Sequence, residues 1–103
     1  MKKTGALKVL KSSRVTTSEF SIHPNDGFDL GLMTTQYEIQ VFHGVSLDEF
    51  TQGKGAGTPA KLKLLNECPK ESFEVHPKVW ESLGSPKTVI LIADGMRILV
   101  QGH

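Results

Sequence analysis

Alternating apolar and polar residues predict a series of short strands along the chain. The alternation is clearest in Tyr37–Phe42, where apolar residues are separated by Glu38 and Gln40. A period of two is typical of a strand with one buried and one solvated face. Similar segments predict further strands over residues 8–10, 20–23, 61–65, 72–75, 88–93 and 96–101. The chain is therefore expected to be mainly β.

One or two short helices are also expected. Pro77–Leu83 has proline at the first helical position and is followed by Gly84, a common C-terminal cap. Ser46 and Glu49 have the spacing of a capping box, which predicts one helical turn there. Asn25–Asp29 is a poor helical sequence because it contains glycine and two aspartates. A tight turn or a 3₁₀ segment is expected at that position.

One sequence pattern occurs twice. Phe20–Pro24 leads to Leu30-Gly31, and Phe73–Pro77 leads to Leu83-Gly84, at a spacing of 53 residues. A period of this length in a chain of 103 residues indicates two copies of one supersecondary unit. The expected boundaries are about 5–51 for the first copy, 52–59 for a Gly-rich linker and 60–102 for the second copy.

Each copy would contain two strands, a short helix and a third strand, with a fourth strand evident only in the second copy. Alone, such a unit has an open edge and an uncovered apolar face. Two units can interlock into a closed barrel, which removes the edges and buries both faces. We therefore expect one domain, residues 1–103, that forms a six-stranded barrel with internal pseudo-twofold symmetry.

The second copy resembles a known structural element. Within Phe73–Val100, a strand ends at Pro77, a helix ends at Leu83-Gly84, and the last two strands are joined by Asp94-Gly95. This pattern is similar to the β-α-β-hairpin element of the cradle-loop barrels, which include the double-psi β-barrels and, more distantly, the AbrB/MazE-type swapped-hairpin DNA-binding proteins. Here Ser85-Pro86-Lys87 replaces the usual Gly-Asp box. Because two units are fused, the resemblance implies a double-psi-like barrel.

The charge balance argues against a strongly cationic nucleic-acid-binding protein. Twelve Lys and Arg residues against eleven Asp and Glu residues leave a net charge of +1. Five basic residues nevertheless precede the first acidic residue, Glu19. They indicate either a solvated basic arm or edge strand, or a local patch that contacts phosphate. The possible nucleic-acid contacts are Lys2, Lys3, Lys8, Lys11 and Arg14.

The single cysteine, Cys68, excludes an internal disulfide and a cysteine-based metal site. Its surroundings predict an inert small residue, and a reducing cytoplasm is the expected setting. The basic N-terminus is not followed by the apolar segment of a signal peptide. The longest apolar run, Val89–Ala93, is too short to cross a bilayer. A soluble protein without a membrane partner is expected.

Two histidines occupy equivalent positions in the two copies. His23 precedes Pro24, and His76 precedes Pro77. A pseudo-twofold axis could bring the two imidazoles together as a site, or each histidine could be present because the unit is repeated. Both residues are retained as possible ligand or partner contacts, without assignment as metal ligands.

Two further residues are possible ligand or partner contacts. His43 precedes Gly44 as Asp94 precedes Gly95, a position that favours a residue tolerant of positive φ. Arg97 follows the same Asp-Gly turn, where it would be either a basic contact or a solvated side chain.

No combination of nucleophile, base and orienting residue is evident, so no catalytic residue and no cofactor is assigned. The first expectation is a non-catalytic binding or adaptor module that recognises a protein partner or ligand. The resemblance allows two alternatives. One is a small subunit that binds a pterin-dinucleotide cofactor in a molybdenum or tungsten oxidoreductase. The other is an AbrB-like DNA-binding regulator that uses the basic N-terminus and Arg97.

Overall fold

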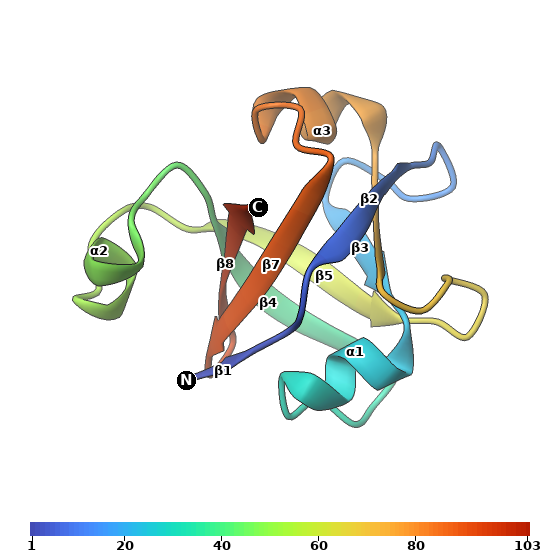
Figure 1. The fold of residues 1–103 in the computed structure, drawn as a ribbon, viewed down its shortest axis with the longest axis horizontal. Helices are drawn as coiled ribbons and strands as arrows, with labels where there is room; N and C mark the ends of the chain where they lie inside the picture. The colour runs from blue at the N-terminus through green and yellow to red at the C-terminus, as the bar shows by residue number, and fades with distance from the viewer.

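The computed structural model describes residues 1–103 as a closed β-barrel with three short helices (Figure 1). The strands are β1 (Lys2–Lys3), β2 (Leu7–Lys11), β3 (Glu19–Ile22), β4 (Gln36–Phe42), β5 (Thr58–Leu64), β6 (Ser72–Val75), β7 (Thr88–Asp94) and β8 (Arg97–Gly102). The helices are α1 (Pro24–Asp29), α2 (Leu47–Thr51) and α3 (Pro77–Ser82). None of these helices has the length and apolar character needed to cross a membrane.

Seven strands close the barrel in the order β7-β2-β6-β3-β5-β4-β8, and β8 pairs again with β7. The predicted count of six is therefore wrong. β8 lies between β4, to which it is parallel, and β7, to which it is antiparallel. The eighth strand, β1, pairs antiparallel with β7 at the basic N-terminus, where either a solvated arm or an edge strand was expected. β5 begins at Thr58, inside the predicted linker.

Strand pairing joins the two halves of the sequence. β2 pairs in parallel with β6, β3 pairs in parallel with β5, and β3 pairs antiparallel with β6. Strands β1 to β4 form no pairs among themselves, and β7–β8 is the only pair formed within the second half. The barrel therefore depends on interlocking of the two halves.

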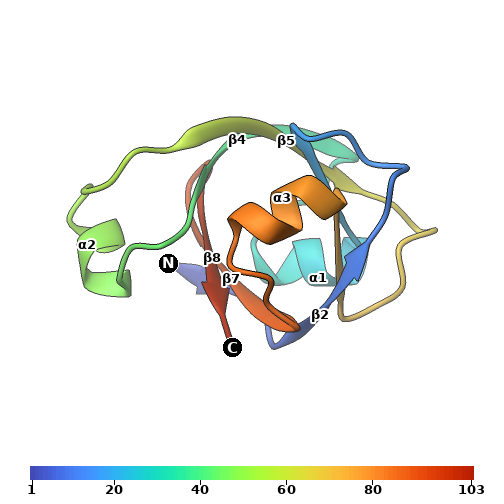
Figure 2. The same cartoon turned by 90° about the horizontal axis from the view of Figure 1, so that it is seen from above.

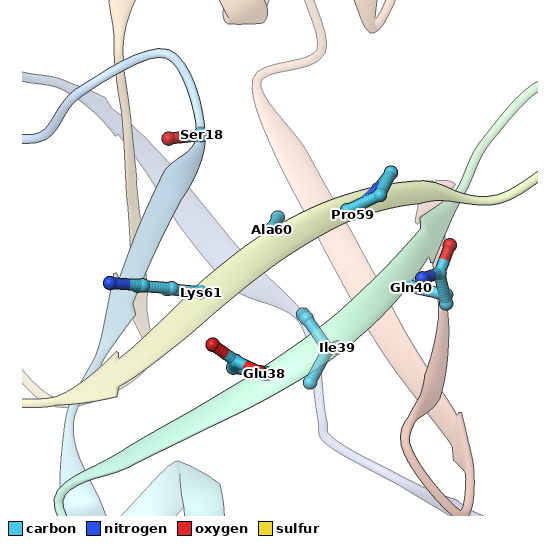
Figure 3. A pocket seen from close by; sticks show the side chains of 7 residues that line it. All are labelled: Ser18, Glu38, Ile39, Gln40, Pro59, Ala60 and Lys61. Atoms are coloured by element: carbon cyan, nitrogen blue, oxygen red, sulfur yellow. The ribbon is translucent and has the colours of Figure 1, made fainter.

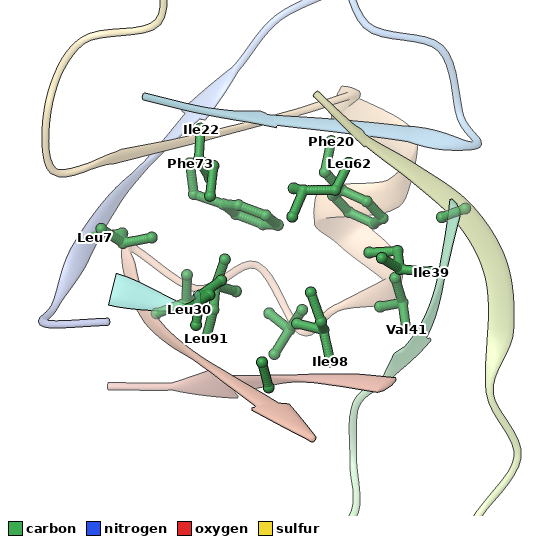
Figure 4. Packing of buried hydrophobic residues seen from close by; sticks show 14 of the residues in the cluster. Leu7, Phe20, Ile22, Leu30, Ile39, Val41, Leu62, Phe73, Leu91 and Ile98 are labelled. Atoms are coloured by element: carbon green, nitrogen blue, oxygen red, sulfur yellow. The ribbon is translucent and has the colours of Figure 1, made fainter. Parts of the chain in front are cut away.

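The barrel interior is filled by apolar side chains from every barrel strand. Seventeen buried residues form this core, and Figure 4 shows ten of them labelled inside the ring of strands. Within it, Phe20 on β3 and Phe73 on β6 stack, with ring centroids 5.2 Å apart. A second cluster of Phe42, Phe50, Ile92 and Leu99 lies beneath α2. β7 and β8 are therefore apolar on both faces, as expected for strands covered on both sides.

Helices α1 and α3 cover opposite ends of the barrel (Figures 1 and 2). The tight turn or 3₁₀ segment predicted at Asn25–Asp29 is wrong, because this segment lies in a six-residue α-helix. Pro24 at the first position and the capping His23 favour the helix. Gly27 is needed for its packing, since a Cβ there would lie 2.4 Å from Leu64 Cδ2.

Helix α3 and the final hairpin confirm their predictions closely. α3 begins at Pro77, and Gly84 follows it with a φ of 90°. Ser46 and Glu49 form the predicted capping box at α2. The positive φ predicted for His43 and Asp94 is wrong, because it falls instead on the glycine that follows each residue. Glycine adopts that conformation without the steric cost of a Cβ.

Candidate functional site

His23 and His76 are helix N-caps. His23 Nδ1 accepts a hydrogen bond from the Asn25 backbone N–H at 3.0 Å, and His76 Nδ1 accepts one from the Lys78 N–H at 3.1 Å. The antiparallel β3–β6 register puts the two histidines beyond opposite ends of that strand pair. Their Cα atoms are therefore about 14 Å apart along the strands. The structure does not bring them together as a pair.

The Arg97 side chain makes its contacts within the chain itself. Its Nη2 donates to the Phe50 carbonyl oxygen at 3.0 Å, and its Nη1 lies 3.1 Å from Asp94 Oδ2. The guanidinium also stacks over the rings of Phe42 and Phe50, 4.8 and 4.6 Å from their centroids. Arg97 therefore fastens α2 to the barrel, which accounts for this residue without an external ligand.

The five N-terminal basic residues are spread along the barrel. Arg14 Nη2 lies 2.6 and 3.1 Å from the two carboxylate oxygens of the buried Glu74. Lys11 Nζ lies 4.1 Å from the centroid of the Trp80 ring. Lys2, Lys3 and Lys8 are exposed, but Lys2 and Lys8 pair with β7 residues five positions apart. This separation is about 17 Å along the strand, so the five residues do not form one cluster.

The titratable groups whose pKa values are shifted most strongly lie in structural surroundings. Burial raises the pKa of the Cys68 thiol to about 11, and the nearby Glu74 adds to the shift. This raised pKa disfavours the thiolate and hence nucleophilic chemistry. A hydrogen bond with Lys63 lowers the pKa of Glu19 to about 2, with Thr16 contributing further. No group of three or more His, Cys, Asp or Glu residues is placed to hold a metal ion.

A broad depression of about 350 Å³ lies on the outer face of β4 and β5. Its polar side chains include Ser18, Glu38, Gln40 and Lys61. Figure 3 shows Glu38 and Gln40 on β4, Lys61 on β5 and Ser18 just before β3, without a common point toward which they converge. Such an arrangement lacks the convergent polar groups typical of a small-molecule site.

Exposed apolar side chains gather around the α1 end and the neighbouring side of the barrel. We call this surface the methionine face and define it by the five large apolar residues that remain exposed: Met1, Phe28, Met33, Leu47 and Met96. They line three depressions of about 300, 330 and 220 Å³. The first two share Leu32, and the second and third share Met1, so the depressions adjoin.

Local structure holds parts of the methionine face in place. The Tyr37 hydroxyl oxygen accepts hydrogen bonds from the backbone N–H groups of Met33 and Thr34, at 2.8 and 3.0 Å. Hydrogen bonding from Thr34 and then Met33 lowers the pKa of Tyr37. Met33 is nevertheless 80% exposed and Phe28 is 67% exposed. The fold therefore presents these side chains to solvent on an ordered backbone.

Sequence reasoning did not identify the methionine face. Phe28 and Met33 are five residues apart, but strands β4 to β7 separate them from Met96, so the three side chains share a surface only after the barrel closes. The available signal was local: Met96 directly follows the Asp94-Gly95 turn, and Phe28 directly follows Gly27. Large apolar residues at turns are more conspicuous than apolar residues within strands.

His43 lies at the other end of the barrel. It lines a cavity of about 150 Å³ between α3, β4 and β5.

Comparison of the chain with protein-family models and with curated protein sequences found no match. The functional interpretation therefore relies on the geometry of the chain itself.

Proposed function

We propose that this protein is a binding module that docks an apolar segment of a protein partner on the methionine face. The main observation is that all five exposed large apolar side chains line adjoining depressions. Exposed large apolar side chains that gather on one surface are typical of an interaction site. Methionine adapts its shape to different apolar groups, so three methionines suit a surface that receives side chains.

Charge around the methionine face indicates the partner's chemistry. Lys2 and Lys3 line the depression that contains Leu47, and no acidic residue lines it. Neither lysine forms an ion pair within the chain. Complementary charge increases association rate and fixes orientation. We therefore infer a partner segment whose apolar side chains are followed by acidic residues on the side toward β1.

The proposal includes a double-psi-like architecture with two related halves. Val9 is opposite Phe73, and Leu62 is opposite Phe20, so each residue of the first pair is 53 positions from its counterpart in the second. The backbone N–H of Lys8 donates to Glu71, and that of Lys61 donates to Ser18, both at 2.8 Å. These matched registers support a pseudo-twofold relation between the halves.

Nucleic-acid binding has less support than protein binding. Arg97, Lys11 and Arg14 already contact Phe50, Trp80 and Glu74, respectively. A protein that binds nucleic acid mainly through phosphate needs several basic side chains on one face. The spread of the N-terminal lysines along the barrel does not provide that arrangement.

The test is selection of peptides from a random library displayed on phage, followed by NMR mapping on ¹⁵N-labelled protein. We expect selected peptides to combine apolar and acidic residues and to shift the amides around Phe28, Met33 and Met96. Met33→Lys and Phe28→Lys should each weaken binding at least about tenfold, because each inserts a charge into an apolar contact. Gln40→Lys, an exposed change on the outer face of β4, is the matched control.

Two results would contradict the proposal. One is a failure to enrich any peptide that binds the folded protein. The other is binding that maps to β4 and β5 and that Gln40→Lys weakens more than Met33→Lys does. Thermal unfolding of each variant would show that the barrel is intact before binding is compared.

A further inference from the structure

The two ends of the barrel are closed to different degrees. Asp26 and Gly27 of α1 are buried, whereas α3 has no buried residue. At the 53-residue spacing of the repeat, Trp80 stands where α1 has Gly27. The glycine lets α1 approach Leu64 closely. The indole of Trp80 instead occupies space beside the barrel, with its Nε1 donating to the Pro86 carbonyl oxygen at 2.8 Å.

A second difference between the copies lies just after each helix. Leu32, which follows α1, is only 4% exposed and belongs to the core. The residue at the equivalent spacing after α3 is Ser85, which is exposed. The α3 end therefore lacks a counterpart of Leu32, and the partly buried Val79, Trp80 and Leu83 pack against the core there instead. The cavity of about 150 Å³ lies beside α3.

This cavity combines an apolar floor with a polar rim. Phe20 and Val41 from the core and Leu83 from the end of α3 line the floor. Thr17, Thr58 and His43, all exposed, line the rim. A mouth of a β-barrel with apolar walls and a few polar groups is a common setting for a ligand.

We infer that the α3 end is a second binding site, separate from the methionine face, for a small aromatic carboxylate. An apolar cavity of about 150 Å³ holds a single aromatic ring. The threonine hydroxyls and the His43 imidazole can donate hydrogen bonds to a carboxylate at the rim. No Asp or Glu lines the cavity to repel that anion.

Methyl NMR with sodium benzoate as the probe tests this inference on the full chain. Benzoate should cause saturable shifts of the Val41, Val79 and Leu83 methyl signals, whereas acetate, which lacks the ring, should not. Benzylamine, with the opposite charge, should bind more weakly than benzoate. His43→Ala should weaken benzoate binding about fivefold through loss of one hydrogen bond. His103→Ala removes an exposed imidazole elsewhere and should leave it unchanged.

Two occluding variants complete the test. Ser82→Trp and Thr17→Trp each add a large side chain at an exposed position on the cavity lining, from opposite sides. Both should abolish the benzoate shifts while the dispersed methyl spectrum of the folded barrel is retained. The inference is overturned if benzoate shifts the methyl signals no more than acetate does, if benzylamine binds equally well, or if folded occluding variants still bind benzoate.

Discussion

Gly27 lies inside α1, where glycine is unfavourable by about 1 kcal/mol relative to alanine. Close packing explains why glycine occupies this position, because a Cβ would lie 2.4 Å from Leu64 Cδ2 and 2.8 Å from Leu64 Cγ. Leu64 is 5% exposed and is part of the core. We predict that Gly27→Ala destabilises the protein by about 1–2 kcal/mol, because overpacking outweighs the gain in helix propensity. Urea unfolding measures this change.

A double-mutant comparison separates the two effects at this position. Leu64→Ala alone should cost about 2–5 kcal/mol, because it leaves a cavity. Adding Gly27→Ala to that variant should be neutral or stabilising by up to about 1 kcal/mol, since the clash is gone and the propensity gain remains. Equal destabilisation by Gly27→Ala in both backgrounds would show that close packing against Leu64 is not the reason for the glycine.

The ion pair between Glu19 and Lys63 should make the folded protein less stable in acid. Its carboxylate lies 2.6 Å from Lys63 Nζ, and this hydrogen bond lowers the pKa of Glu19 from 4.5 to about 2 in the folded protein. The stabilisation is therefore complete above about pH 4.5 and is lost as the pH falls toward 2. Lys63 is about one-third exposed, so solvent screening limits the contribution of the pair to about 0.5–1 kcal/mol.

The corresponding measurement is the free energy of unfolding of wild type and Glu19→Gln at pH 7 and at pH 2. Glu19→Gln should be less stable than wild type at pH 7, and the difference should be clearly smaller at pH 2, where the Glu19 carboxylate is partly protonated. Glu67→Gln changes an exposed carboxylate that forms no ion pair and serves as the control. A difference between wild type and Glu19→Gln that is the same at both pH values would refute the role of this ion pair.

At the scale of elements, a side chain from β8 adds to the packing of Phe50 in holding α2 against the barrel. Arg97 on β8 bonds to the carbonyl of Phe50, and its guanidinium covers the Phe42 and Phe50 rings. We predict that Arg97→Ala lowers the opening free energy of α2 by about 1–2 kcal/mol, because a hydrogen bond and the cation–π contacts are lost. Hydrogen exchange of the Phe50 amide, which bonds to Ser46, measures this opening.

The effect of Arg97→Ala should be local to α2. Amides in the β3–β6 pair should keep their protection, since Arg97 does not contact those strands. Arg97→Lys should recover only part of the protection, because an ammonium cannot reproduce the planar fork of the guanidinium. Lys54→Ala, at an exposed position just after α2, is the control. Unchanged exchange at Phe50 in Arg97→Ala would contradict the docking role.

Elements with a complete local signal were predictable from sequence. Ser46 and Glu49 specify the capping box, and Asp94-Gly95 specifies the final hairpin, because each signal lies within a few residues. α1 was missed because the reason for Gly27 is contact with Leu64, which is distant in the sequence. The capping role of the histidines was also missed, since Ser, Thr, Asp and Asn are the usual N-caps.

At the scale of the whole molecule, closure of the barrel was predictable, but the number of strands in it was not. Unpaired strand edges are a liability, so the sheet is expected to close into a barrel, but this does not specify which strand completes the barrel. β8 takes that place because its apolar residues cover both the core and the cluster beneath α2. The methionine face also depends on closure of the barrel. Closure makes the depression lined by Phe28 adjoin the depression lined by Met96, because Leu32 lines both. Long-range geometry of this kind has no signature in a local sequence window.

Interlocking of the halves leads to a prediction for the whole chain. Strands β1 to β4 pair only with strands of the second half, so a fragment of residues 1–54 would have no sheet partner for any strand. The fragment of residues 55–103 would keep only the β7–β8 hairpin, and an isolated hairpin is at best marginally stable. The break falls between Lys54 and Gly55, in an exposed loop where cleavage removes no strand.

We therefore predict that each fragment is unfolded alone and that an equimolar mixture forms a 1:1 complex with the spectrum of the intact protein. Circular dichroism and analytical ultracentrifugation would measure folding and stoichiometry. Phe73→Ala in the second fragment should weaken reassembly strongly, because Phe73 stacks on Phe20 across the interface between halves. Lys87→Ala, an exposed change in the same fragment, should have little effect. Cooperative folding of residues 1–54 alone would mean that strand pairing between the halves is not what stabilises this barrel.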